Sequence, residues 1–109
     1  MKSLVMVQLL LLLCTSHVVA GGVYGTITDG SKPIAAGVKV EIDASGKVYT
    51  AETDKFGSYR IFVKEKGKCT LTVHLKEQSP SVDLFSYDKS TRYDWILETK
   101  DEKLLLRRK

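Results

Sequence analysis

Apolar and polar residues alternate along most of the chain after residue 22. The clearest case is Val38–Ile42, where every second side chain is apolar, and the same pattern returns in residues 68–75. A period of two is the period of a β-strand with one face in the core and the other in water. We expect eight strands on this pattern, covering residues 23–28, 38–43, 47–53, 58–63, 68–75, 82–85, 91–98 and 103–108.

Turn-forming residues separate these runs about every 8 to 12 residues, which is typical of all-β sandwiches and barrels. Gly and Pro supply special backbone angles, and an Asp side chain can hydrogen-bond its own backbone. No segment offers the helix that a parallel crossover connection requires. The chain therefore predicts a seven- to eight-stranded antiparallel β-sandwich, in which residues 58–63, apolar on both faces, form a central strand.

The first 20 residues follow a different pattern. Lys2 is followed by an apolar run over residues 4–13, and Val18-Val19-Ala20 ends the segment in small residues. This is the order of a cleavable signal helix, and an apolar run of about ten residues is short for a membrane span. We expect cleavage after Ala20, with residues 1–20 as signal peptide and 21–109 as one β-sandwich domain, either periplasmic or secreted.

Cys14 offers an alternative for the same segment, because a bacterial lipoprotein signal ends at a cysteine that becomes lipidated. The residue before such a cysteine is normally Gly, Ala or Ser, whereas this chain has Leu13. We therefore favour release over attachment through Cys14.

Charge and cysteine content limit the partners of the remaining 89 residues. Lys2 is the only charged residue of the signal segment, so 16 basic and 13 acidic side chains remain, with a net charge of +3. They are interspersed, with one short basic cluster at residues 107–109, which does not favour a nucleic-acid partner. Cys69 becomes the sole cysteine, cannot form an intramolecular disulfide, and shares the apolar phase of its strand, so we expect it in the core.

Several segments together resemble the carboxypeptidase regulatory-like domain, including small bacterial exported versions of it. The resemblance is carried by residues 23–29 (VYGTITD), 33–34 (PI), 37–40 (GVKV), 53–59 (TDKFGSY) and Gly67 before a closing strand. It implies an Ig-like or prealbumin-like sandwich of the transthyretin type, grouped with carbohydrate-binding-like folds. In carboxypeptidases this domain accompanies a separate catalytic zinc domain, so it implies no catalytic activity.

Residues suited to catalysis are few. A zinc hydrolase site needs about three protein ligands, usually with histidine among them, and His74 is the only histidine after residue 20. Transthyretin-like 5-hydroxyisourate hydrolases, which share the implied fold, use histidines, an arginine and a C-terminal Tyr-Arg-Gly-Ser. This chain ends in Leu-Arg-Arg-Lys, and no spacing gives His74 a partner, so hydrolysis is a remote alternative.

Binding is therefore the function we expect: a non-catalytic exported module of the cell envelope, without cofactor or metal, holding an envelope protein or a glycan. The alternative is a carbohydrate-binding module, which requires exposed aromatic rings. Tyr93 and Trp95 share an apolar phase with Leu97 and are expected in the core. The candidate ligand contacts are Tyr24, Tyr49 and Tyr87.

Overall fold

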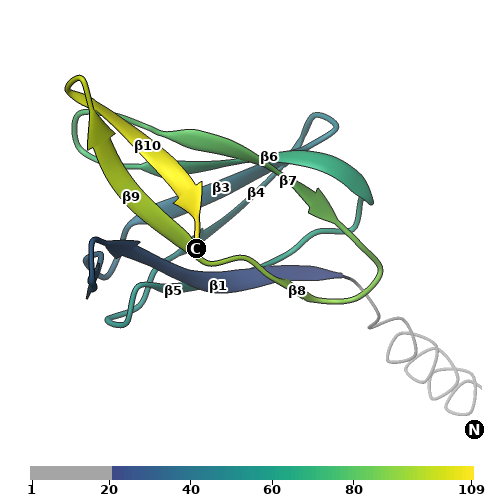
Figure 1. Ribbon diagram of the computed structural model, residues 1–109. Helices are drawn as coiled ribbons and strands as arrows, with labels where there is room; N and C mark the ends of the chain where they lie inside the picture. The colour runs from purple at the N-terminus through teal and green to yellow at the C-terminus, as the bar shows by residue number, and fades with distance from the viewer. Residues whose placement is uncertain (1–20) are drawn as a thin grey trace, which may run out of the picture.

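Two β-sheets face each other in the computed structural model, which describes residues 21–109 (Figure 1). The predicted signal peptide, its cleavage position and Cys14 lie outside the described residues. The strands are β1 (Gly22–Asp29), β2 (Lys32–Pro33), β3 (Lys39–Ala44), β4 (Lys47–Glu52), β5 (Ser58–Phe62), β6 (Gly67–His74), β7 (Ser81–Ser86), β8 (Thr91–Arg92), β9 (Trp95–Lys100) and β10 (Lys103–Arg108). The predicted all-β sandwich is confirmed.

The first sheet is organised around β1, and the second has the order β4-β3-β6-β7. On one side β1 pairs with β5, and on the other it pairs with β8 and then with β9. The second sheet is antiparallel throughout, but β8 and β9 run parallel to β1, so the prediction of wholly antiparallel sheets is wrong in this detail. The reason is that the β7–β8 connection enters the first sheet at the end where β1 begins.

The predicted strand 91–98 is interrupted at Tyr93 and Asp94, which separate β8 from β9. Here the amide of Tyr93 donates to the carbonyl of Tyr24 (2.8 Å), while the amide of Thr26 donates to the Asp94 side chain (2.8 Å) in place of a backbone acceptor. This local break bends the chain along β1 and turns the Asp94 carboxylate onto the outer face.

The core lies between the two sheets and is filled by the inward half of each alternating strand. Val23, Ile27, Val40, Ile42 and Leu71 are among its fully buried members. Burying an aliphatic side chain of this size contributes about 1.5–3 kcal/mol. The alternation read from the sequence therefore identifies the inward residues of the long strands correctly.

Tyr93 and Trp95 lie inside this core, as predicted, with their rings stacked at a centroid distance of 5.6 Å. The indole N–H of Trp95 donates to the hydroxyl of Tyr59 (3.0 Å), which in turn donates to the carbonyl of Tyr93 (2.7 Å). Burial raises the pKa of the Tyr59 phenol above its usual range. Cys69 is also buried, as predicted, and burial raises the pKa of its thiol.

The prediction that residues 58–63 form a central strand is wrong. Among the described strands β5 pairs only with β1, so it lies at the edge of the first sheet. Tyr59 and Ile61 face the core, but Phe62 is 58% exposed on the outer face. The apolar run suggested burial on both sides, although only every second residue contributes to the core.

None of residues 21–109 belongs to a helix that could cross a membrane.

Candidate functional site

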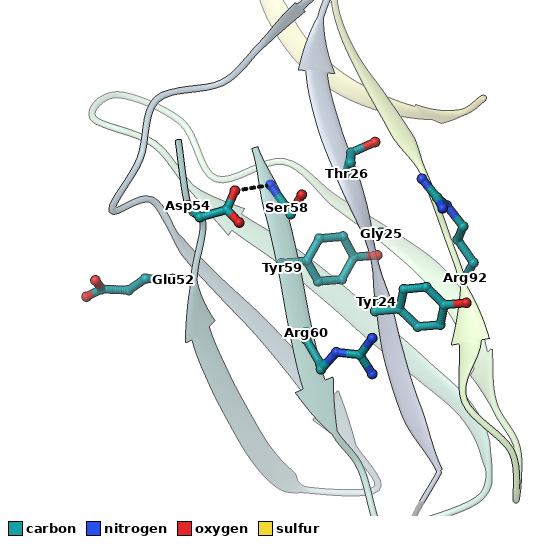
Figure 2. Close-up of a pocket in the computed structure, with 9 residues that line it drawn as sticks. All are labelled: Tyr24, Gly25, Thr26, Glu52, Asp54, Ser58, Tyr59, Arg60 and Arg92. Carbon is teal, nitrogen blue, oxygen red and sulfur yellow. Dashed lines mark hydrogen bonds between the residues drawn. The ribbon is translucent and has the colours of Figure 1, made fainter. Parts of the chain in front are cut away.

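A depression of about 470 Å³ lies on the outer face of the first sheet and reaches the end of β4. We call it the Tyr24 pocket (Figure 2). Its lining residues come from β1, β4, β5, β8 and the β4–β5 turn: Tyr24, Gly25, Thr26, Glu52, Asp54, Ser58, Tyr59, Arg60 and Arg92. The site is thus built from three adjacent strands of the first sheet, the end of β4 from the second sheet and one tight turn.

Strand register places an arginine on each side of Tyr24. In the antiparallel pair β1–β5 Tyr24 lies opposite Arg60, and in the parallel pair β1–β8 it lies opposite Arg92. The Arg60 guanidinium stacks over the Tyr24 ring, 4.6 Å from its centroid, and this cation–π contact fixes the position of the charge. One ring face of Tyr24 is therefore covered by a cation.

Asp94 fixes the second guanidinium from the edge of the pocket. Its Oδ2 accepts from Nε of Arg92 (2.9 Å), and its Oδ1 accepts from the amide and the hydroxyl of Thr26 (2.8 and 3.1 Å). Burial on its own raises the pKa of the Asp94 carboxyl, but the bonds from Arg92 and Thr26 outweigh burial and hold this pKa below its usual value. Asp94 is therefore ionised at neutral pH and keeps Arg92 beside the sheet.

Gly25 makes this arrangement sterically feasible. A Cβ atom at position 25 would lie 1.9 Å from the carbonyl oxygen of Tyr93 and 2.9 Å from Oδ1 of Asp94. Only glycine lets β1 approach the interruption between β8 and β9 this closely.

The opposite rim is formed by the β4–β5 turn. Oδ1 of Asp54 accepts from the amides of Phe56 and Ser58, both at 2.9 Å, and the Ser58 bond is drawn in Figure 2. Gly57 lies within this turn at φ = 72°, and its carbonyl accepts from the amide of Ile27 (2.9 Å). The turn is thereby tied to β1, and the Ser58 hydroxyl is held at the pocket.

Unused hydrogen-bonding capacity distinguishes the Tyr24 pocket. Arg60 makes no hydrogen bond to any residue of 21–109, and Arg92 donates there only through Nε. A guanidinium carries five N–H donors in a planar fork suited to carboxylates. Asp54 adds a carboxylate at the other rim, and Glu52 lines the end of β4 with its carboxylate pointing away from the two arginines (Figure 2). The pocket can therefore offer fixed cationic donors and nearby acceptors to a polar ligand.

Of the predicted contact residues, the structure places Tyr24 and Tyr87 at two different cavities and Tyr49 at neither. Tyr49 packs against the core, and its hydroxyl donates to Glu65 (2.6 Å). This bond is the main cause that raises the pKa of the Tyr49 phenol and lowers the pKa of the Glu65 carboxyl. The three tyrosines therefore do not form one surface.

Tyr87 lies on a second cavity, of about 680 Å³, between the β5–β6 and β7–β8 loops. It is half exposed and stacks with Phe85 at a centroid distance of 6.5 Å. Lys66 and Asp88 form an exposed ion pair there (2.8 Å). Ser86 also lines this cavity, and its hydroxyl is buried without a hydrogen-bond partner among residues 21–109. An exposed aromatic pair next to polar loop residues is suited to a sugar ring.

A third cavity, of about 470 Å³, opens at the β2 end of the sandwich. Leu97 of β9, Leu104 of β10 and Leu75, which follows β6, line it beside Ile34 and Val38. These side chains belong to the core cluster or pack against it, so this cavity is an end of the core.

His74 has partners that the spacing along the sequence did not indicate. Its Nε2 lies 3.1 Å from Oε1 of Glu41, and its Nδ1 lies 3.4 Å from the hydroxyl of Ser79. Glu41 is on β3 and lies next to His74 only because β3 pairs with β6. The serine contact is long, and His74, Glu41 and Ser79 line none of the three cavities above. Among residues 21–109, no group of three potential metal ligands converges.

Arg60, Arg92 and Asp94 are the site residues that sequence reasoning missed. Arg60 and Arg92 are outward positions of β5 and β8, and Asp94 lies in the interruption between β8 and β9. Charged residues are common at such positions and carry no individual signal. These three residues lie close together because of the register of β5 and β8 against β1. The turn residues, which the sequence does show, do not determine that register. A conserved outward Tyr-Arg pattern among relatives would be the signal to search for.

Comparison with known proteins defines the fold. No protein-family model matches the sequence, and no curated protein matches it by sequence. A 5-hydroxyisourate hydrolase from Klebsiella pneumoniae is similar in structure, with a TM-score of 0.59 and 16% sequence identity over 82% of this chain and 98% of that chain. A candidate carbohydrate-binding protein from Bacteroides uniformis is similar with a TM-score of 0.56 and 14% identity, over 74% of this chain and 48% of that chain. The domain thus has a transthyretin-like, prealbumin-type β-sandwich fold.

Proposed function

We propose that the domain is a non-catalytic binding module of the cell envelope that holds its ligand at the Tyr24 pocket. The observation that carries this proposal is the pair of arginines opposite Tyr24, one stacked on its ring and one bonded to Asp94, both with N–H donors that find no partner among residues 21–109. Fixed donors on a rigid scaffold lose little conformational entropy on binding, which is what a recognition site requires.

Export is part of the proposal. It rests on the sequence of residues 1–20, where Lys2, an apolar run broken only by Gln8 and the small residues 18–20 follow the order of a cleavable signal peptide. N-terminal sequencing of the protein recovered from the envelope fraction tests it. We expect the sequence to start at Gly21, and an intact Met1 on protein recovered from the cytosol would contradict export.

Hydrolysis is the rival function, since one neighbour in fold is a hydrolase. The Tyr24 pocket holds hydroxyls and carboxylates, but no histidine or cysteine lines it. The His74–Glu41 pair lies elsewhere, and its contact to Ser79 is long. We expect no turnover of 5-hydroxyisourate or of simple esters above the uncatalysed rate. Turnover that disappears in both His74→Ala and Ser79→Ala would establish an enzyme instead.

Sugar binding at the second cavity, in place of the Tyr24 pocket, is the second candidate, favoured by the exposed Phe85–Tyr87 pair beside that cavity. The neighbour from Bacteroides uniformis, a candidate carbohydrate-binding protein, lends it support at the level of fold. Replacing Tyr87 by Ala separates this site from the Tyr24 pocket, because the two cavities share no lining residue.

Affinity capture with matched baits tests the main proposal. Residues 21–109 are immobilised as wild type, as Arg60→Gln/Arg92→Gln and as Lys68→Gln, and are exposed to solubilised envelope material and to a glycan array. Lys68 is an exposed cation of the second sheet, so its variant controls for lost charge. We expect the ligand retained by wild type and Lys68→Gln to be lost from the double variant and to be recovered chemically unchanged. Equal retention by all three baits would remove the Tyr24 pocket as the binding site.

A further inference from the structure

We infer that the ligand of the Tyr24 pocket is an acidic saccharide, with carboxylate groups held at Arg60 and at Arg92 and ring hydroxyls bonded at the opposite rim. This inference rests on the proposed function and names its ligand class.

The carboxylate part follows from the two arginines. Both are cross-strand neighbours of Tyr24 in the backbone register. The Arg60 guanidinium lies over the Tyr24 ring, and the Arg92 guanidinium points toward Thr26, farther along β1 (Figure 2). Arg60 is held by the Tyr24 ring and Arg92 by Asp94, and each keeps N–H donors free of partners among the described residues. A carboxylate has two oxygens and about four lone-pair sites, enough for a bidentate contact with either guanidinium group.

The saccharide part follows from the acidic residues at the same pocket. Glu52 and Asp54 line its other rim, and Asp94 pairs with Arg92 at its edge. These carboxylates would repel a small anion such as phosphate. A sugar acid avoids the conflict because its hydroxyl groups donate to carboxylates while its own carboxylate accepts from arginine. The hydroxyls of Thr26 and Ser58 supply further partners.

A neutral sugar fits less well, because its usual platform is covered. Sugars stack their apolar face on an exposed aromatic ring, but Arg60 already lies over the Tyr24 ring. Stacking there would displace a guanidinium from a contact that stabilises it by about 0.5–1 kcal/mol at an exposed site. A carboxylate accepts from this guanidinium without moving it.

An extended peptide also fits less well. Peptides that add to a sheet bond to the free backbone groups of an edge strand. The Arg60 and Arg92 side chains extend over β1, whose backbone pairs with β5 on one side and with β8 and β9 on the other. The free edge in this region is the outer edge of β5. A peptide added there would bond the β5 backbone and not the two guanidinium groups, so its binding would survive Arg60→Gln and Arg92→Gln.

Calorimetric titration with one saccharide in two charge states tests the inference. Oligogalacturonate carries a carboxylate on each ring, and its full methyl ester has the same rings without charge. We expect wild type to bind the acid form about tenfold or more tightly than the ester, as for loss of a hydrogen bond to a charged group. Arg60→Gln and Arg92→Gln should each remove most of this preference, whereas Lys68→Gln should keep it.

The other outcomes separate this inference from the proposed function. If acid and ester bind wild type equally and both weaken in Arg60→Gln, the pocket binds saccharides but the acidic preference is overturned. If neither form binds, the acidic-saccharide inference is overturned, and the capture experiment decides the proposed function by itself.

Discussion

The indole N–H of Trp95 donates to the hydroxyl of Tyr59 across 3.0 Å inside the core. The same Tyr59 hydroxyl donates a hydrogen bond to the backbone carbonyl of Tyr93. One hydroxyl from β5 thus satisfies a buried donor of β9 and a buried acceptor in the segment that shapes the Tyr24 pocket. The two hydrogen bonds of the Tyr59 hydroxyl therefore link Trp95 in the core to the segment that shapes the Tyr24 pocket.

Tyr59→Phe should lower the free energy of unfolding by about 1–3 kcal/mol, because it leaves the buried Trp95 donor and Tyr93 acceptor unpaired. Urea unfolding followed by tryptophan fluorescence measures the loss. Tyr49→Phe is the matched control, since it removes a hydroxyl that bonds Glu65 on a half-buried side chain. Equal losses of unfolding free energy in the two variants would mean that the hydrogen bonds of Tyr59 stabilise the fold no more than the Tyr49–Glu65 bond does.

Asp94 should make stability depend on pH in the acid range. Its pKa is lower in the folded than in the unfolded chain, so its contribution is fully present above about pH 4 and is lost as the pH falls through the folded value. The difference in unfolding free energy between wild type and Asp94→Asn should therefore shrink on acidification from pH 6 towards pH 2. Asp83→Asn, at an exposed ion pair with Lys68, is the control and should cost less than about 1 kcal/mol. A difference for Asp94→Asn that stays constant with pH would contradict the ionic role.

Gly25→Ala should destabilise the domain by more than about 2 kcal/mol, because its Cβ would overlap the Tyr93 carbonyl at 1.9 Å. Gly46→Ala is the comparison, since nothing lies within 4 Å of its Cβ and only the positive φ of 90° is unfavourable. Thermal unfolding of both variants gives the contrast. A Gly25→Ala variant as stable as Gly46→Ala would show that β1 does not need this close approach.

The sequence was sufficient for the fold because the features that decide it are local. Alternation in Val38–Ile42 and residues 68–75 marks the inward side chains, and Gly57 and Asp54 mark a turn that the structure contains. The sequence was insufficient for features that depend on which strands pair with one another. Phe62 lies in an apolar run but on an edge strand, and β8 and β9 run parallel to β1 because of where the chain re-enters the sheet.

The candidate site likewise combines one residue that the sequence suggested with neighbours that only strand pairing brings to it. Tyr24 was identified from its residue type, but the partners that make it a site were not. Arg60 and Arg92 are 32 positions apart in the chain and meet at Tyr24 through two separate strand registers. Glu41 reaches His74 by the same kind of pairing. Long-range register is a property of the whole packed sandwich and has no signature in a short segment.

Chemical-shift mapping of backbone amides during titration with oligogalacturonate tests the central claim most directly, because it locates the ligand without any substitution. We predict that the shifts concentrate at residues 24–26, 58–60 and 92–94 and saturate together. Shifts confined to residues 66–67 and 86–91, or no shifts at saturating concentrations, would contradict the claim that the Tyr24 pocket binds an acidic saccharide.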